Sequence, residues 1–462
     1  MSAVREGARA WLLAGLCATG CGDDAGTPTV PIGSLDASTG PDASSGRGDA
    51  SAAADATLAA DGQVSSDAGT VADGSAHPHG DAAQVLPGSD GGVLPVAQCS
   101  FEQNGISVVS RSAVSPDDPL SLSMHNDGAS LNWVEYQSGR RRLTQLWFDV
   151  ADKSHSVSPV PPPESDTSSQ TAPASAATAS GFLTVWSDDL VAKDVFNLRA
   201  EALDASGAAI SEQPSILTSD TMSNRAPALA TGKDGKAVVI WQTASGTGRS
   251  LQIGADGNAL GRVLEVPDFA GSSGHPALTS LLDGYVLAWV DTSAKRVRMQ
   301  RLDAAGAPVG ASQPVDAEGN AHGTVDIATT TGGGALVWDV YVAGTRAEVR
   351  FRTFDKSANL TGYEHALTDA PDTGLMPSIA PLAGGYAVAY RSAVPLDYAV
   401  RLALVSPAGG LIAAKTLSPI VDTQLPLVLR ITPDGQNLFL SWTDVVEGQT
   451  AYQLRRTWIH CD

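Results

Sequence analysis

Beyond residue 118 the chain alternates short apolar runs with polar turns, and the same order of runs recurs seven times. In one such unit, residues 276–279 lead to a turn at Gly284, and the runs 285–289, 297–302 and 309–315 follow. Short runs rich in β-branched and aromatic residues, divided by glycine turns, are typical of antiparallel strands. Each unit is therefore predicted to form four strands, whereas helical periodicity is confined to the N-terminal segment.

Three positions keep their place in the repeat. An aromatic residue ends the second run of every unit, at spacings of 48 to 55 residues: Trp133, Trp186, Trp241, Trp289, Trp338, Tyr390 and Trp442. The third run carries Arg199, Arg249, Arg298, Arg350, Arg401 or Arg455, with Thr144 in the first unit. The first run starts at Pro119, Pro173, Pro227, Pro276, Gly323, Pro377 or Pro426. Repeats of this length built from short strands predict an all-β fold, a seven-bladed β-propeller of four-stranded antiparallel blades over residues 99–462.

The last unit ends at Asp462 after only three strands, which would leave a sheet edge open. Residues 105–110 alternate in polarity and are predicted to supply the missing outer strand, so that the two ends of the domain overlap. Cys99 and Cys461 lie at these ends and are expected to form a disulfide after export to an oxidising compartment. Two free thiols are the alternative, and in that case the ends need not meet.

The N-terminal segment has the pattern of a signal peptide over residues 1–20. Arg5 and Arg9 precede the apolar run 10–18, which is too short to span a membrane. The following Ala18-Thr19-Gly20-Cys21 resembles the lipobox of bacterial lipoproteins, with Ala18 where leucine is usual. This resemblance implies that Cys21 is lipidated and anchors the chain, whereas the alternative is ordinary cleavage without a lipid.

Residues 21–98 are dominated by Ala, Ser, Gly and Asp and contain no aromatic residue. Such a segment buries too little apolar surface to offset the entropy of ordering it, so we expect a disordered tether. The formal charge of −21 disfavours nucleic acid and anionic membrane surfaces as partners. We expect a monomer in the cell envelope, outside the cytoplasm, with the outer membrane or cell surface favoured over the inner membrane.

Four units contain a Trp-x-acidic motif, which is similar to repeats in uncharacterised secreted bacterial propellers. The acidic residue and the arginine flank the same hairpin loop, which predicts the ion pairs Asp188–Arg199, Asp291–Arg298 and Asp444–Arg455. We interpret these pairs as structural, and sugar binding by the arginines is the alternative.

Polar residues at the starts of the first runs mark a candidate site at the channel mouth: Asp118, Arg225, His275 and His322. Together they could line a polar pocket for a metal or an acidic sugar, although scattered loop residues around solvent are the alternative. The sequence lacks a nucleophile elbow, zinc-type His/Cys spacing, a P-loop and an EF-hand loop, so no catalytic residue, metal or cofactor is assigned.

These patterns favour a lipid-anchored binding or scaffold protein that uses one propeller face to bind a glycan, peptide or protein partner. The main alternative is a polysaccharide hydrolase or lyase with His275 or His322 as the base. A third possibility is an assembly part of an envelope machine that uses the side of a blade. An enzyme needs His, Tyr, Arg and carboxylates concentrated at one mouth, and here such residues are thinly spread.

Overall fold

The computed structural model describes residues 98–461 except 102–104, 111–113, 127, 150–154, 160–167, 270–271, 318, 343–345, 369–371, 395–396, 421–424 and 446–450. The predicted signal peptide, the lipidation site Cys21 and the tether up to residue 97 lie outside this part of the chain. The described residues form strands and turns without a helix. Accordingly, no helix in this region could cross a bilayer.

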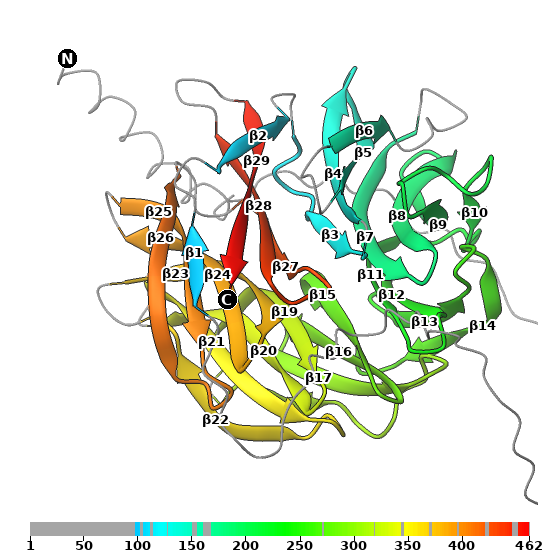
Figure 1. The fold of residues 1–462 in the computed structure, drawn as a ribbon. Coiled ribbons are helices and arrows are strands. Elements are labelled where there is room, and N and C mark those ends of the chain that lie inside the picture. Colours follow the sequence, from blue (N-terminus) through cyan, green and yellow to red (C-terminus); the bar gives the residue numbers. More distant parts are fainter. Residues whose placement is uncertain are drawn as a thin grey trace, which may run out of the picture. The chain divides into compact units, whose positions relative to one another are not determined.

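The strands form seven antiparallel sheets arranged around a ring (Figure 1). The first blade contains β3 (Ser121–Met124), β4 (Gly128–Gln137), β5 (Arg140–Asp149) and β6 (His155–Pro159). The second contains β7 (Gln170–Thr178), β8 (Gly181–Ala192), β9 (Val195–Asp204) and β10 (Ser215–Ile216). The third contains β11 (Asn224–Thr231), β12 (Ala237–Thr243), β13 (Gly248–Ile253) and β14 (Ala259–Val266). The fourth contains β15 (Ser272–Leu281), β16 (Gly284–Asp291), β17 (Arg296–Asp303) and β18 (Gln313–Pro314).

The remaining three sheets complete the ring. The fifth blade contains β19 (Ala321–Thr330), β20 (Gly333–Val342), β21 (Arg346–Asp355) and β22 (Leu360–Ala366). The sixth contains β23 (Gly374–Leu382), β24 (Gly385–Val394), β25 (Asp397–Val405) and β26 (Leu411–Pro419). The seventh contains β27 (Leu427–Ile431), β28 (Asn437–Val445) and β29 (Tyr452–Cys461), with β1 (Cys99–Phe101) and β2 (Ser107–Ser110). The innermost strand of each blade contacts that of the next, and β27 contacts β3, so the predicted seven-bladed propeller is confirmed and closed.

The repeated aromatic and arginine residues face each other across neighbouring strands. Trp289 lies opposite Arg298, Trp186 opposite Arg199, and the first unit places Trp133 opposite Thr144. The aromatic side chains are almost completely buried between the sheets, where Trp289 packs edge-on against Phe269 with ring centroids 5.5 Å apart. The repeat therefore marks the large apolar side chains that hold adjacent blades together.

Glycine is needed at the turn between the first two strands of the second blade. Gly181 has φ +147°, and a Cβ there would lie 2.3 Å from the carbonyl oxygen of Leu203. No other residue fits this close approach of two backbones.

The outer strand of the fourth blade is shorter than predicted. The run 309–315 forms only β18, whose two residues pair with Arg298 and Met299 of β17. Upstream of β18 the amide of Gln300 donates to the carbonyl oxygens of Val309 and Gly310. A side chain thus replaces part of the strand ladder, which the apolar pattern does not reveal.

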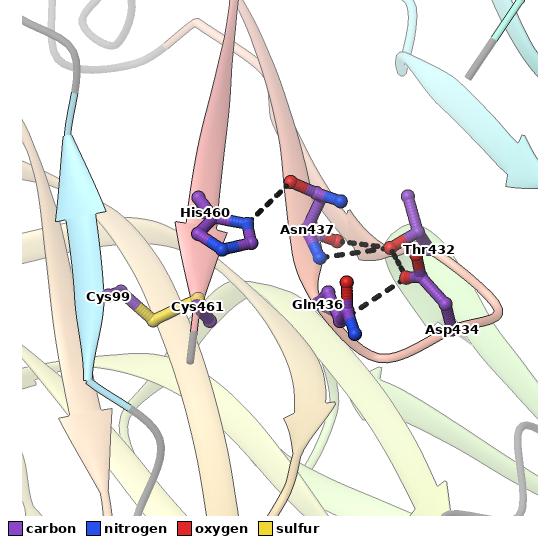
Figure 2. The surroundings of a disulfide bond; sticks show 7 residues. All are labelled: Cys99, Thr432, Asp434, Gln436, Asn437, His460 and Cys461. Atoms are coloured by element: carbon purple, nitrogen blue, oxygen red, sulfur yellow. Dashed lines mark hydrogen bonds between the residues drawn. A yellow bond between two sulfur atoms is a disulfide. The ribbon is translucent and has the colours of Figure 1, made fainter. Parts of the chain in front are cut away.

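Both β1 and β2 pair with the outer edge of β29, which confirms the predicted overlap of the chain ends. Cys99 lies opposite Cys461, and the two are joined by a disulfide across 362 positions (Figure 2). Beside it the Nδ1 atom of His460 lies 3.1 Å from the amide oxygen of Asn437 on β28. The seventh blade is therefore completed by the N-terminal end of the domain.

Aromatic packing seals the seam between the last blade and the first. Phe148 of β5 lies 5.1 Å from Phe439 of β28, measured between ring centroids. The guanidinium of Arg456 lies over Phe148 at 4.1 Å, and burial lowers the pKa of Arg456 to about 10. The apolar core thus continues across the point where the ring closes.

Candidate binding site at the propeller mouth

A cavity of about 510 Å³ opens where the innermost strands begin. The repeated residues that start the first runs all line it: Pro119, Pro173, Pro227, Pro276, Gly323, Pro377 and Pro426. Because proline has a fixed φ and no N–H donor, this ring is rigid and apolar. Its polar groups come from a few neighbouring side chains, which is typical of ligand pockets of this size.

A second cavity of about 220 Å³ follows farther along the same strands. The two cavities follow each other along the central channel, because they share several lining residues: Leu122, Ser175, Leu229, Leu278 and Arg430. Hydroxyl groups from adjacent blades meet in this channel. The Ser121 and Ser175 hydroxyls lie 2.8 Å apart, and those of Thr279 and Thr329 lie 3.0 Å apart.

The backbone bulges where the innermost strands enter the mouth. Register shifts interrupt the pairing of β7, β11, β15, β19 and β23 with the second strand of each blade. Ala172, Ala226 and Met376, each directly before a proline, have φ +51°. Bulges and left-handed residues re-aim strands and side chains, here at the cavity rim.

Asp118 lies in the cavity lining and is held by hydrogen bonds within the protein. One carboxylate oxygen accepts from the Ser115 hydroxyl at 2.7 Å, and the other accepts from the Ala172 backbone N–H of the second blade at 3.0 Å. Arg141 adds a longer ion pair at 3.7 Å. These contacts make Asp118 a connector between the first two blades at the mouth.

His275 also lines the cavity, from the bulged start of β15. Its side chain is partly buried, and its Nδ1 atom has no hydrogen-bond partner among the described residues. Burial lowers the pKa of the His275 imidazole, although the Asp118 carboxylate opposes this effect. The ring is therefore neutral at pH 7 and can accept or donate a hydrogen bond.

The other two predicted site residues have different surroundings. Arg225 is exposed, and its guanidinium lies over the Phe196 ring at 5.4 Å, outside the described lining of the cavity. His322 lies on β19 next to the lining residue Gly323, and its side chain lies outside the described part of the structure. The described side chains therefore bring Asp118 and His275 to the mouth.

The sequence interpretation missed a charged network on the channel wall. Arg430 of β27 lies 3.1 Å from the carboxylate of Asp326 on β19. Between them Ser378 of β23 donates its hydroxyl to the same carboxylate oxygen at 2.6 Å. The sequence did contain a sign of this network. The first runs are otherwise apolar or carry hydroxyl groups, but those of the fifth and seventh units each contain one charged residue, Asp326 and Arg430.

The three predicted ion pairs are present. Arg199 lies 3.0 Å from Asp188, Arg298 lies 3.9 Å from Asp291, and Arg455 lies 3.5 Å from Asp444. Burial raises the pKa of Asp188, while hydrogen bonds and Arg199 oppose that shift. In the first unit, the Trp133 indole donates to Glu135 at 2.8 Å. The Trp-x-acidic motif thus places a carboxylate beside the buried aromatic residue and the arginine opposite it.

Within the described residues, no three His, Cys, Asp or Glu side chains gather as metal ligands. The polar groups of the mouth include one neutral imidazole, the Arg430 guanidinium, and carboxylates that already accept hydrogen bonds from the protein. This arrangement can orient the hydroxyl, amide or carboxylate groups of a ligand.

No family model and no curated protein matches the chain. Solved structures with a similar fold include the polysaccharide lyase Uly1, with 9% identity over 78% of this chain and 99% of that chain, at a TM-score of 0.47. Another is regucalcin, a calcium-binding protein from Agrobacterium tumefaciens, with 14% identity over 78% and 95% and a TM-score of 0.40. A third is the β-propeller domain of the Trilobed protease from Pyrococcus furiosus, with 9% identity over 74% and 93% and a TM-score of 0.43. At these identities and TM-scores, the likenesses assign neither a ligand nor a reaction to this chain.

Proposed function

We propose that this protein is a lipid-anchored binding protein of the cell envelope whose propeller mouth binds a glycan, peptide or protein partner. The main support for the proposal is the cavity of about 510 Å³ inside a ring of six prolines and Gly323. Its volume lies within the range of roughly 300–1,000 Å³ usual for ligand pockets. The lipid on Cys21 and the tether that follows are expected to hold the domain at a membrane.

The polar groups of the mouth suit recognition. Asp118 and Asp326 are fixed by hydrogen bonds from neighbouring blades, and Arg430 is held against Asp326. Side chains that are held in place lose little entropy when a ligand binds, which favours affinity and specificity. The apolar proline faces can pack against sugar C–H groups or apolar side chains, while His275 and Arg430 contact polar groups.

The test is ligand screening with the full chain carrying Cys21→Ser, which removes the lipid. A glycan array and a pull-down from envelope extract are expected to identify a ligand, and His275→Ala and Arg430→Gln should each weaken its binding about tenfold. Arg249→Gln is the matched control, because Arg249 pairs with Asp220 away from the mouth at 2.8 Å. Equal binding by both mouth variants and the control would refute the proposal.

A polysaccharide hydrolase or lyase is the second candidate, and the neutral imidazole of His275 supports it. A histidine whose pKa is lowered is available as a base at pH 7. Product release from a polysaccharide panel would distinguish this function from binding alone. Turnover should then fall at least a hundredfold in His275→Ala while binding persists.

A further inference from the structure

The inner of the two channel cavities, of about 220 Å³, differs from the mouth in its charge. Asp117, Asp118 and Asp326 line only the outer cavity, whereas Arg430 lines both. Among the described residues that line the inner cavity, Arg430 is the one charged side chain, and the others are apolar or carry hydroxyl groups. The volume is below that of pockets for drug-sized ligands, so this cavity suits one small ring at the end of a larger molecule.

One nitrogen of the Arg430 guanidinium is bound by the protein. Its Nη1 donates to the Leu429 carbonyl oxygen at 2.7 Å and to the Asp326 carboxylate at 3.1 Å, and it lies 3.4 Å from the Ser378 hydroxyl. These partners belong to the seventh, fifth and sixth blades. A long side chain that is already held loses little entropy when a ligand binds to its remaining donors.

The other edge of the same guanidinium is free to bind a ligand. Nε and Nη2 of Arg430 have no hydrogen-bond partner among the described residues. The side chain is 36% exposed and neither nitrogen is fully buried, so a ligand in the channel can reach both. Nε–H and one Nη2–H point the same way, which matches the two oxygens of a carboxylate.

The neighbouring carboxylate of Asp326 is surrounded by donors. Its Oδ1 accepts from the Ile327 backbone N–H at 2.9 Å. Its Oδ2 accepts from the Ser378 hydroxyl at 2.6 Å, from the Ile379 backbone N–H at 3.1 Å and from Arg430. Because these donors offset much of its charge, Asp326 repels a second carboxylate on the far edge of Arg430 only weakly.

The rim is more negative than the inner cavity. Asp117 and Asp118 lie 3.5 Å and 3.7 Å from the same guanidinium, that of Arg141, so two described carboxylates face one cation there. A chain with many negative charges would meet repulsion at this rim. A ligand with a single carboxylate at its end suits the channel better.

The rest of the inner cavity suits a sugar ring. The Thr279 and Thr329 hydroxyls lie 3.0 Å apart, and because one proton is shared between them, the pair keeps one O–H to donate. Leu229 and Leu278 provide apolar surface for the C–H groups of a ring. A sugar acid uses these groups more fully than a peptide C-terminus, which has one N–H beside its carboxylate and no ring hydroxyls.

The closed ring of blades decides which part of a ligand reaches this cavity. Each innermost strand contacts the next, and β27 contacts β3, so a chain cannot enter the channel from the side. A glycan that comes through the mouth therefore reaches the inner cavity with its end first.

From this geometry we infer that the Nε–H and Nη2–H groups of Arg430 bind the carboxylate of a uronic acid residue at the end of an otherwise neutral glycan. The sugar ring occupies the inner cavity beside Thr279 and Thr329, and the rest of the chain leaves through the prolines of the mouth. The inference rests on the function proposed for the mouth and names the class of its ligand.

Saturation-transfer NMR titrations on the full chain carrying Cys21→Ser test this assignment. The probes are glucuronic acid, galacturonic acid, the methyl ester of each and the peptide trialanine. We expect transfer to at least one of the two acids, and about tenfold weaker binding of its methyl ester, which keeps the ring but lacks the charge.

Three variants separate the guanidinium from the hydroxyl groups. Arg430→Gln should weaken binding of the acid at least tenfold and leave the affinity for the ester within about twofold. Arg430→Lys keeps the charge without the two parallel N–H groups, so its affinity for the acid should lie between those of the wild type and Arg430→Gln. Thr279→Val should weaken the acid and the ester alike, about fivefold.

Arg249→Gln is the control, because Arg249 pairs with Asp220 away from the channel, and it should bind the acid like the wild type. Transfer to neither acid, an ester that binds as tightly as its acid, or equal affinity of Arg430→Gln and Arg249→Gln for the acid would each overturn the inference. Tighter binding of trialanine than of both acids would also overturn it, in favour of a peptide C-terminus. A neutral glycan or protein partner whose binding requires His275 but not Arg430 would overturn the inference and leave the proposed function of the mouth intact.

Discussion

Arg430 and Asp326 lie 3.1 Å apart although they belong to the seventh and fifth blades, and the sixth blade contributes Ser378 between them. The Ser378 hydroxyl also accepts from the Leu429 backbone N–H, so three consecutive inner strands share one network. Such a network fixes the spacing of these strands around the channel as well as the position of the Arg430 guanidinium.

Because both side chains are partly exposed, we expect Asp326→Asn and Arg430→Gln each to lower the free energy of unfolding by only about 1–2 kcal/mol. The double variant should lose less than the sum, with a coupling of about 1 kcal/mol. Urea denaturation of the four proteins in the cycle measures this. Strictly additive losses would mean that the two side chains do not stabilise each other.

The repeated ion pairs should differ in strength because they differ in burial. Arg199 and Asp188 are 10% and 2% exposed, whereas Arg298 and Asp291 are 28% and 15% exposed and 0.9 Å farther apart, at 3.9 Å rather than 3.0 Å. Arg199→Gln leaves a buried carboxylate without its charge partner and should cost about 3 kcal/mol, while Arg298→Gln should cost less than about 1 kcal/mol. Equal denaturation midpoints for the two variants would contradict this prediction.

The disulfide should contribute substantially to stability because it links positions 362 residues apart. Replacing Cys99 and Cys461 by alanine is expected to lower the free energy of unfolding by about 2–5 kcal/mol in oxidising buffer. Dithiothreitol should reduce the stability of the wild-type protein to a similar extent. The same treatment of the double variant is the control, and it should have no effect.

Glu201 should make stability depend on pH. Its side chain is 1% exposed, both carboxylate oxygens lack a partner among the described residues, and burial raises its pKa to about 7. Because an unfolded glutamate has a pKa of about 4.3, the folded state binds the proton more tightly. This stabilisation is complete below about pH 4 and is lost as the pH rises to about 7.

Glu201→Gln keeps the shape and removes the charge. It should therefore leave stability nearly unchanged near pH 4 and raise it by up to about 3 kcal/mol at pH 8. Thermal unfolding of both proteins across this range gives the difference. A constant difference between pH 4 and pH 8 would show that folding does not raise the pKa of Glu201.

Replacing Ala172 by glycine should stabilise the folded protein, whereas the same substitution in a strand is usually destabilising. Its φ of +51° is unfavourable for an alanine, whereas glycine adopts it without a steric cost. We expect Ala172→Gly to raise the free energy of unfolding by up to about 1 kcal/mol. Ala174→Gly, two positions along the same strand β7, is the control and should lower it.

The blade architecture could be predicted because it depends on residues that repeat. Trp289 and Arg298 recur as a pair because they face each other in the ladder, even though the loop between them varies in length from blade to blade, and every blade needs a large side chain at that position. Cys99 and Cys461 could be paired because they lie at the two ends of the predicted propeller, which the ring closure brings together. The order of residues along the sequence was therefore enough to predict the blades and the disulfide.

The sites were less predictable because they depend on departures from the repeat. Asp326 and Arg430 are separated by 104 positions, and their contact follows only from the order of inner strands around the channel. Arg225 lies two positions before a proline that lines the cavity. However, the bulge between Arg225 and Ala228 shifts the strand register, so the alternation of side chains cannot be extended from Ala228 back to Arg225. A sequence pattern gives the position of a residue along its strand more readily than the side on which it emerges at a bulge.

The attachment of β1 to β29 determines how the domain would respond to mechanical tension. Three residues of β1 pair with the sheet edge, and an edge strand this short peels away readily when its end is pulled. A pull applied at residue 98 is instead transmitted through the sulfur atoms to Cys461, on a strand that is bonded along both sides. Tension on this end of the domain is therefore opposed by the pairing of β29 on both of its sides, and not by the three residues of β1 alone.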